Sequence, residues 1–230
     1  KLELANDVRN IDVESLDASM ERNADVIVGL KVRACHTDDP NHSPFLEAAQ
    51  RSSQGKPVMV HLGRFPHTPT IPTPKLLEAL RPGDIITHAF RGAGGMLDAN
   101  GTVIPEFDDA VERGVRLDVG HSGTDFRFSD ARKLFDQGYF PDTVSTDLNI
   151  FNVGGPVYSL AETMTKILTM GVDLIDVVGM CTSNTADVIG RGDRYGRLEV
   201  GRRAHVSVLA MESDPIEVSD GKVSVTADEW

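Results

Sequence analysis

The chain has 230 residues, 40% of them apolar and 25% charged, a composition that excludes an intrinsically disordered or low-complexity protein. Its 23 basic and 35 acidic residues give a formal net charge of −12, which disfavours nucleic acid or an anionic membrane as the main partner through electrostatic repulsion. Two cysteines cannot form a disulfide framework, and no apolar run approaches the roughly 18 residues of a membrane span.

Short, nearly unbroken apolar runs recur along the first two thirds of the chain. Such runs are typical of strands that are buried on both faces of a parallel sheet. The predicted strands are 24–33, 57–61, 84–88, 115–119 and, more weakly, 142–147.

Helical segments lie between these runs. Ser43 before Pro44 is a helix-start signal, and Thr73 before Pro74 repeats it. The predicted helices are 43–50, 73–80, 105–113, 130–137 and 157–170. Strands that alternate with helices predict an α/β fold with right-handed βαβ units.

The end of the chain has a different pattern, rich in turns and β-branched residues. Residues 195–201 resemble a hairpin, 204–209 predict a strand, and 222–226 predict another. We therefore expect two domains, a catalytic α/β domain over 1–194 and a small β segment over 195–230.

Ionisable side chains follow the predicted strands at their carboxyl ends. Lys31, His61, His88 and Asp147 lie at or near four such ends, and His121 lies just beyond another. The carboxyl ends of the strands form the active-site face of an α/β barrel, so these residues are expected to converge.

Two hypotheses describe the side chain of Lys31, because apolar residues flank it in the sequence and burying an unpaired ammonium is costly. It either forms an ion pair with an acidic neighbour or is a neutral amine. A neutral lysine amine is nucleophilic and can react with carbon dioxide, giving a carbamate that can bridge two metal ions.

The residues around these strand ends resemble those of the amidohydrolase superfamily, in its dihydroorotase-like and deacetylase subgroup. The matching segments are 29–33, 59–61, 86–90, 117–121 and 145–148, with 182–186 and 196–206 resembling the closing part of the family. His205 stands where the family usually has an aspartate, at a structural position. The resemblance implies a (β/α)8 TIM barrel of the metal-dependent hydrolase type and a small β-sandwich beside it.

The resemblance also implies roles for the residues. Lys31, as a carbamate, would bridge two divalent ions, most often zinc, and His61 and His88 would bind the more exposed ion. Asp147 would bind the other ion and act as general acid and base for a metal-bridged hydroxide. Arg33 and His121 are lower-ranked candidates for substrate contacts, with a rim salt bridge and a structural role as their alternatives.

Only about strands four to eight of such a barrel are found in this sequence, together with part of the sandwich. The His-any-His pair of the first strand is not among the seven histidines. Open sheet edges favour self-association, so we expect a homo-oligomer.

The leading function is hydrolysis of an amide, cyclic amide or ester bond of a small molecule. The alternatives are an inactive amidohydrolase fragment that serves as a binding or assembly module and, less favoured, a metal-independent flavodoxin-like enzyme. The cysteine usage and the lack of a signal-peptide pattern in residues 1–10 predict a cytoplasmic location.

Overall fold

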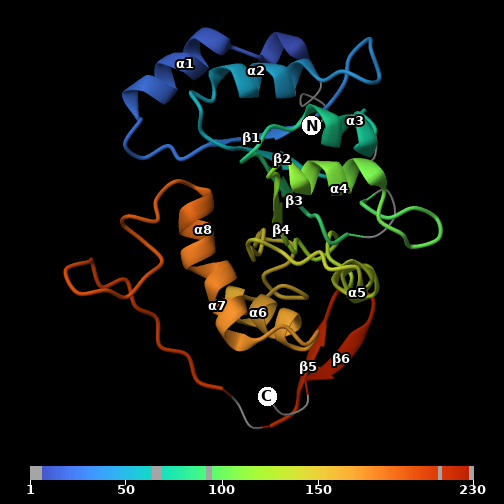
Figure 1. The fold of residues 1–230 in the computed structure, drawn as a ribbon, viewed down its shortest axis with the longest axis vertical. Coiled ribbons are helices and arrows are strands. Elements are labelled where there is room, and N and C mark those ends of the chain that lie inside the picture. The colour runs from blue at the N-terminus through green and yellow to red at the C-terminus, as the bar shows by residue number, and fades with distance from the viewer. Residues whose placement is uncertain (1–6, 64–68, 92–94, 212–213, 228–230) are drawn as a thin grey trace. The chain divides into compact units, whose positions relative to one another are not determined.

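The computed structural model of the chain describes residues 7–63, 69–91, 95–211 and 214–227. The chain divides into two compact units, the first made of residues 1–87 and 94–116 and the second of residues 88–93 and 117–230. Both units alternate helices with strands or extended segments along the chain (Figure 1). This is the α/β pattern that the apolar runs predict.

The first unit contains three strands that pair in parallel in chain order, β1 (Leu30–Arg33), β2 (Val58–His61) and β3 (Ile85–Thr87). Its helices are α1 (Val13–Arg22), α2 (Pro44–Ser52), α3 (Thr73–Ala79) and α4 (Pro105–Glu112), preceded by a short 3-10 turn, η2 (Val8–Asn10). α2 packs on β1, α1 packs on α2, and α3 packs on α4 (Figure 1). The β2 and β3 side chains Val58, Val60 and Ile86 are fully or almost fully buried in this core.

Of the two predicted helix-start residues, Ser43 and Thr73, only Ser43 caps its helix. The Ser43 hydroxyl accepts the N–H of Leu46 at 3.2 Å and caps α2, as predicted. Thr73 was expected to cap α3 in the same way, but it lies inside the helix, and Pro72 is the cap without a side-chain hydrogen bond. α1 was not predicted from the sequence, although Asp12 caps it by accepting the N–H of Ser15 at 2.9 Å.

Gly29 precedes β1 where the backbone approaches Pro57 closely. A Cβ atom at this position would lie 2.5 Å from the Pro57 carbonyl oxygen, a distance that requires the backbone to shift. We expect Gly29→Ala to lower the free energy of unfolding by about 1–3 kcal/mol, as overpacking typically does. Urea denaturation would measure it, with Gly154→Ala as the control, because that position has open space and no positive φ. Equal destabilisation by both changes would contradict the steric argument.

Most of the second unit follows the start of β4 (Arg116–Asp118) along the chain. It contains α5 (Phe128–Asp136), α6 (Leu160–Leu168), α7 (Leu174–Cys181), α8 (Ser183–Val188) and the antiparallel pair β5 (Ile216–Ser219) and β6 (Ser224–Ala227). α6 packs against α7 and β5, and α7 against α8 (Figure 1). Phe90, Phe126 and Ile167 are completely buried here. Nowhere in the described ranges is a helix both long and apolar enough to cross a membrane.

Three predicted strands differ from the structure. The first is shorter, since β1 starts at Leu30 and residues 24–26 form a turn. Residues 142–147 form no strand, and their one bridge is the parallel pair of Thr143 with Asp118. Residues 204–209 also form no strand, and Val206 and Val208 are exposed. A segment with alternating β-branched residues forms a strand only where a neighbouring strand supplies backbone hydrogen-bond partners. Among the described residues, no strand pairs with 204–209.

Candidate active site

In the first unit, the predicted residues of β1 and β2 share one face of the sheet. Lys31 pairs with Met59, and Arg33 pairs with His61, in the parallel register. Because side chains alternate along a strand, Lys31, Arg33 and His61 point to the same side. His61 is buried, Arg33 is half-buried and Lys31 is exposed.

The exposure of Lys31 corrects the expectation that its amine is desolvated. The apolar neighbours Leu30 and Val32 point to the other face of the strand, so they do not cover the lysine side chain. The sequence run that suggested burial therefore describes the opposite side of β1. A carbamate on Lys31 is consequently supported by the family resemblance rather than by the surroundings of the side chain.

In the second unit, His88 is completely buried and held in an unusual backbone conformation. Its φ of 67° lies in the left-handed region, which is uncommon for residues other than glycine, although asparagine, aspartate and histidine adopt it more often than the rest. Its Nδ1 atom lies 2.5 Å from the carbonyl oxygen of Gly120, so Nδ1 carries the proton and donates it. The lone pair of neutral His88 is then on Nε2, the arrangement that metal-binding histidines use.

Asp147 lies opposite that nitrogen atom. Its Oδ2 atom is 4.0 Å from Nε2 of His88, and its side chain is 45% exposed. Its φ is 47°, also in the left-handed region. Asn149 and Asn152 donate side-chain hydrogen bonds to the Asp147 carbonyl at 3.1 and 3.0 Å. Backbone strain of this kind persists only where surrounding contacts enforce it, and it concentrates at functional sites.

A second carboxylate, Asp125, adds negative charge near His88. Burial raises the pKa of Asp125, but the hydroxyl of Ser122 and the positive charge of Arg91 lower it, and the net shift is downward. Ser122 donates to Asp125 at 2.5 Å, and Arg91 lies 3.2 Å from it. Ser122 is a third residue with left-handed φ, at 50°. Neither Asp125 nor Arg91 lies at a strand end, so the strand-end pattern in the sequence did not point to them.

Asp118 was likewise not singled out. It is almost fully buried at the end of β4 and accepts the hydroxyl protons of Thr143 and Ser145, each at 2.7 Å. These bonds hold the segment that leads to Asp147 beside β4, in place of the strand predicted there. Backbone bonds from Val119 to Thr143 and from His121 to Ser145 continue the alignment.

His121 is completely buried, with its ring 5.2 Å from that of Phe126. Its Nδ1 atom accepts the N–H of Gly123 at 3.0 Å, and its Nε2 atom lies 3.2 Å from Nζ of Lys166. Burial, the largest cause, lowers the pKa of His121 to about 4, so the ring is neutral at pH 7. These contacts support the structural alternative for His121 and make Lys166 a residue that the sequence analysis missed.

His88 and Asp147 offer a ring nitrogen and a carboxylate oxygen, two of the ligand types that zinc takes, and their Nε2 and Oδ2 atoms are 4.0 Å apart. No cluster of three or more histidine, cysteine, aspartate or glutamate side chains that could hold a metal occurs among the described residues. Of the four predicted ligands, Lys31 and His61 belong to the first unit, and His88 and Asp147 to the second.

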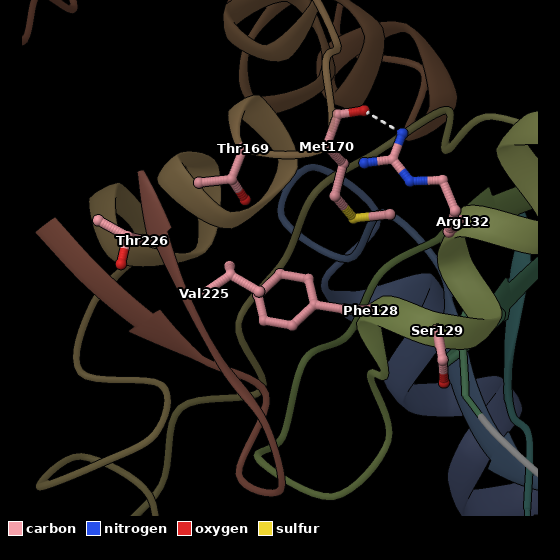
Figure 2. A pocket seen from close by; sticks show the side chains of 7 residues that line it. All are labelled: Phe128, Ser129, Arg132, Thr169, Met170, Val225 and Thr226. Atoms are coloured by element: carbon pink, nitrogen blue, oxygen red, sulfur yellow. Dashed lines mark hydrogen bonds between the residues drawn. The ribbon is translucent and has the colours of Figure 1, made fainter. Parts of the chain in front are cut away.

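A separate cavity of about 280 Å³ opens between α5, the end of α6 and β6 (Figure 2). Its lining includes the side chains of Phe128, Met170 and Val225, and the Arg132 guanidinium donates to the Met170 carbonyl at 2.7 Å. None of the predicted site residues lines this cavity. It is therefore distinct from the candidate active site.

Residues 24–227 match the sequence profile of the Amidohydrolase family. The match covers most of the chain, so the chain belongs to the amidohydrolase family, as the strand-end residues indicated. Members of this family generally bind divalent metal ions.

Curated relatives of similar sequence are deacetylases. The chain is 34% identical to a deacetylase of Agrobacterium fabrum (strain C58) over 224 residues, which are 96% of this chain and 54% of that protein. It is 33% identical to a deacetylase of Brucella anthropi over 230 residues, again 96% of this chain and 54% of the relative. The chain thus spans about half the length of the curated relatives it matches.

Two solved structures are similar in fold and sequence. An adenine deaminase has a TM-score of 0.90 and 27% identity, with 99% of this chain and 63% of that chain covered. A dihydroorotase has a TM-score of 0.80 and 32% identity, with 96% and 61% covered. The chain shares the mixed α/β architecture of these amidohydrolase structures.

Proposed function

We propose that this chain carries part of the active site of a metal-dependent hydrolase that cleaves an amide, cyclic amide or ester bond of a small molecule. The main support for the proposal is the proximity of His88 and Asp147, whose Nε2 and Oδ2 atoms are 4.0 Å apart. Both residues have a backbone φ in the left-handed region. The deacetylase, deaminase and dihydroorotase relatives act as support for the reaction class.

The family resemblance supports a barrel of which this chain supplies about strands four to eight. Under this proposal, residues 1–194 belong to the catalytic barrel, and residues 195–230 belong to the β-sandwich segment. The hairpin of β5 and β6 is the described β structure within the second segment.

In the proposed mechanism, His61, His88, Asp147 and the carbamate of Lys31 would hold two divalent ions, most often zinc. When bound, such ions lower the pKa of a water molecule and polarise the carbonyl group of a substrate. The carboxylate of Asp147, nearly half exposed, accepts the proton of the attacking water and returns it to the leaving nitrogen or oxygen. Gly120 keeps His88 in the Nδ1-protonated tautomer throughout.

Hydrolysis assays of the purified chain test this proposal. The assays would use N-acetyl amino acids, dihydropyrimidines or hydantoins, and acetylated hydroxy acids, each with added zinc and bicarbonate. We expect turnover of at least one class, its loss on treatment with a chelator, and its recovery when zinc is restored. Turnover that a chelator does not change would contradict the metal-dependent mechanism. The complete absence of turnover with metal bound would favour the alternative of an inactive binding module.

A further inference from the structure

Lys166 is a buried ionisable side chain that the proposed mechanism does not use. It lies in α6 and is completely buried, on the same helix face as Thr163, which is also buried. A lysine in such a position is costly as an ammonium ion unless strong partners compensate its charge.

Two polar groups lie within hydrogen-bond distance of the Lys166 amine. Nζ donates to the carbonyl oxygen of Pro156, and it lies 3.2 Å from Nε2 of His121. The carboxylate of Glu162, one helical turn earlier, forms a longer ion pair with the amine at 3.7 Å. The two groups nearest to the amine are therefore a neutral carbonyl group and a neutral ring.

The position of the ring proton of His121 decides whether the ring or the Lys166 amine donates the hydrogen bond between them. Its Nδ1 atom accepts the N–H of Gly123 at 3.0 Å, so the single proton of the neutral ring is on Nε2. That N–H points at Nζ of Lys166, which must supply a lone pair to accept it. An ammonium has no lone pair and would force the ring proton onto Nδ1, against the N–H of Gly123.

Burial favours the same assignment, whereas the neighbouring carboxylates oppose it. Burial lowers the pKa of Lys166, although Glu162 and Asp220 oppose this change. Asp220 accepts three backbone N–H groups and lies near the positive charge of Arg127, so its charge is largely compensated. Glu162 is partly exposed to solvent, which weakens its effect on the amine.

The amine also joins two segments that flank the candidate site. His121 begins the turn after β4, and Pro156 lies in the loop that follows Asp147. The two segments pack closely, since a Cβ atom on Gly123 would lie 3.1 Å from the Pro156 side chain. Asn152 donates both to the carbonyl of Ser122, in the turn, and to that of Asp147.

We propose that Lys166 is a positioning residue that works as a neutral amine. It accepts the Nε2–H of His121 and donates to Pro156, and thereby fixes the loop that carries Asp147 against the turn after β4. The effect on catalysis rests on the proposed function, whereas the protonation state of Lys166 does not.

Three substitutions separate a neutral amine from an ammonium ion. Lys166→Gln keeps a neutral side chain that can accept from His121 and donate to Pro156. Lys166→Arg keeps a positive charge but cannot accept a hydrogen bond from His121. Lys166→Met keeps a side chain of similar length but can bond neither to His121 nor to Pro156. We expect Lys166→Met and Lys166→Arg to lower kcat about 10–100-fold through misplacement of Asp147. Lys166→Gln should retain most of the wild-type kcat. Recovery by arginine but not by glutamine would overturn the proposal.

A measurement on the unaltered chain is independent of activity and of how the variants fold. Nitrogen-15 and carbon-13 NMR of labelled lysine and histidine reports the charge of Lys166 and the tautomer of His121. At pH 7 we expect a neutral Lys166 amine and a His121 proton on Nε2. A charged Lys166 or a proton on Nδ1 would refute the proposal, even if the chain proves to be an active hydrolase. Conversely, the expected spectra from a chain without turnover would leave this proposal intact and count against the proposed function.

Discussion

Asp147→Asn is expected to lower kcat for hydrolysis by about 10²–10⁴-fold, the usual contribution of a positioned general acid and base. Asparagine tolerates the left-handed φ of 47° at this position, so the backbone should not change. The bonds from Asn149 and Asn152 go to the backbone carbonyl, and they survive the substitution. Steady-state kinetics with the best substrate found would measure the effect, and thermal unfolding would show that the fold is retained.

Asp136→Asn is the matched control for this prediction. It removes one carboxylate of the same unit, but from the exposed end of α5. The control variant should keep the kcat of the unaltered chain. If Asp147→Asn behaves like Asp136→Asn, Asp147 is not the acid and base of the reaction.

Asp84→Ala is expected to have the largest effect on stability, a loss of about 3–5 kcal/mol in the free energy of unfolding. Asp84 is 1% exposed and accepts the backbone N–H groups of Val58 and Arg81, each at 3.0 Å. It also pairs with the Arg81 guanidinium at 2.9 Å and accepts from the Gln50 side chain at 3.1 Å. Alanine leaves these donors without their acceptor in the core of the first unit.

The effect of Asp84→Ala should depend on pH. Burial raises the pKa of Asp84. The hydrogen bonds from Arg81, Val58 and Gln50 lower this pKa by more than burial raises it, so the net shift is downward. The stabilisation is therefore complete above the unfolded-state pKa of about 3.9, and it declines as the pH falls through the lower folded-state value. Urea denaturation at pH 7 and near pH 3 should show a smaller difference at the lower pH.

Asp109→Ala serves as the control for stability, because Asp109 is an exposed carboxylate on α4. Its removal should change the free energy of unfolding by no more than about 0.5 kcal/mol. A similar loss for Asp84→Ala and Asp109→Ala would contradict the structural role of the Asp84 network.

Local signals in the sequence predicted the helices better than the strands. The proline-led helices α2, α3 and α4 were found because proline fixes φ and needs no hydrogen-bond acceptor in the first turn. The predicted strand at 204–209 failed because a strand depends on a neighbour that the local sequence does not specify. Asp12 and Ser15, an N-cap pair, were a usable signal for the missed helix α1.

The candidate site was partly predictable for a similar reason. His88 was found because it follows a buried strand, and the carboxyl end of a strand is read directly from the apolar run. Alternation along the strand already places the apolar neighbours of Lys31 on the other face, but the local sequence does not specify what covers the face of the lysine, so its exposure was not predicted. Lys166 was missed, although a lysine on the apolar face of α6, between Thr163 and Met170, is a detectable exception to helix patterning.

The metal content of the purified chain tests the central claim most directly. Elemental analysis would compare the chain with its His88→Asn variant, both grown with zinc and bicarbonate; asparagine tolerates the φ of 67° at this position and removes the imidazole. We predict that zinc copurifies with the unaltered chain and that the variant loses at least one ion for each chain. The same zinc content in both proteins, or no zinc in the unaltered chain, would contradict a metal site at His88 and Asp147.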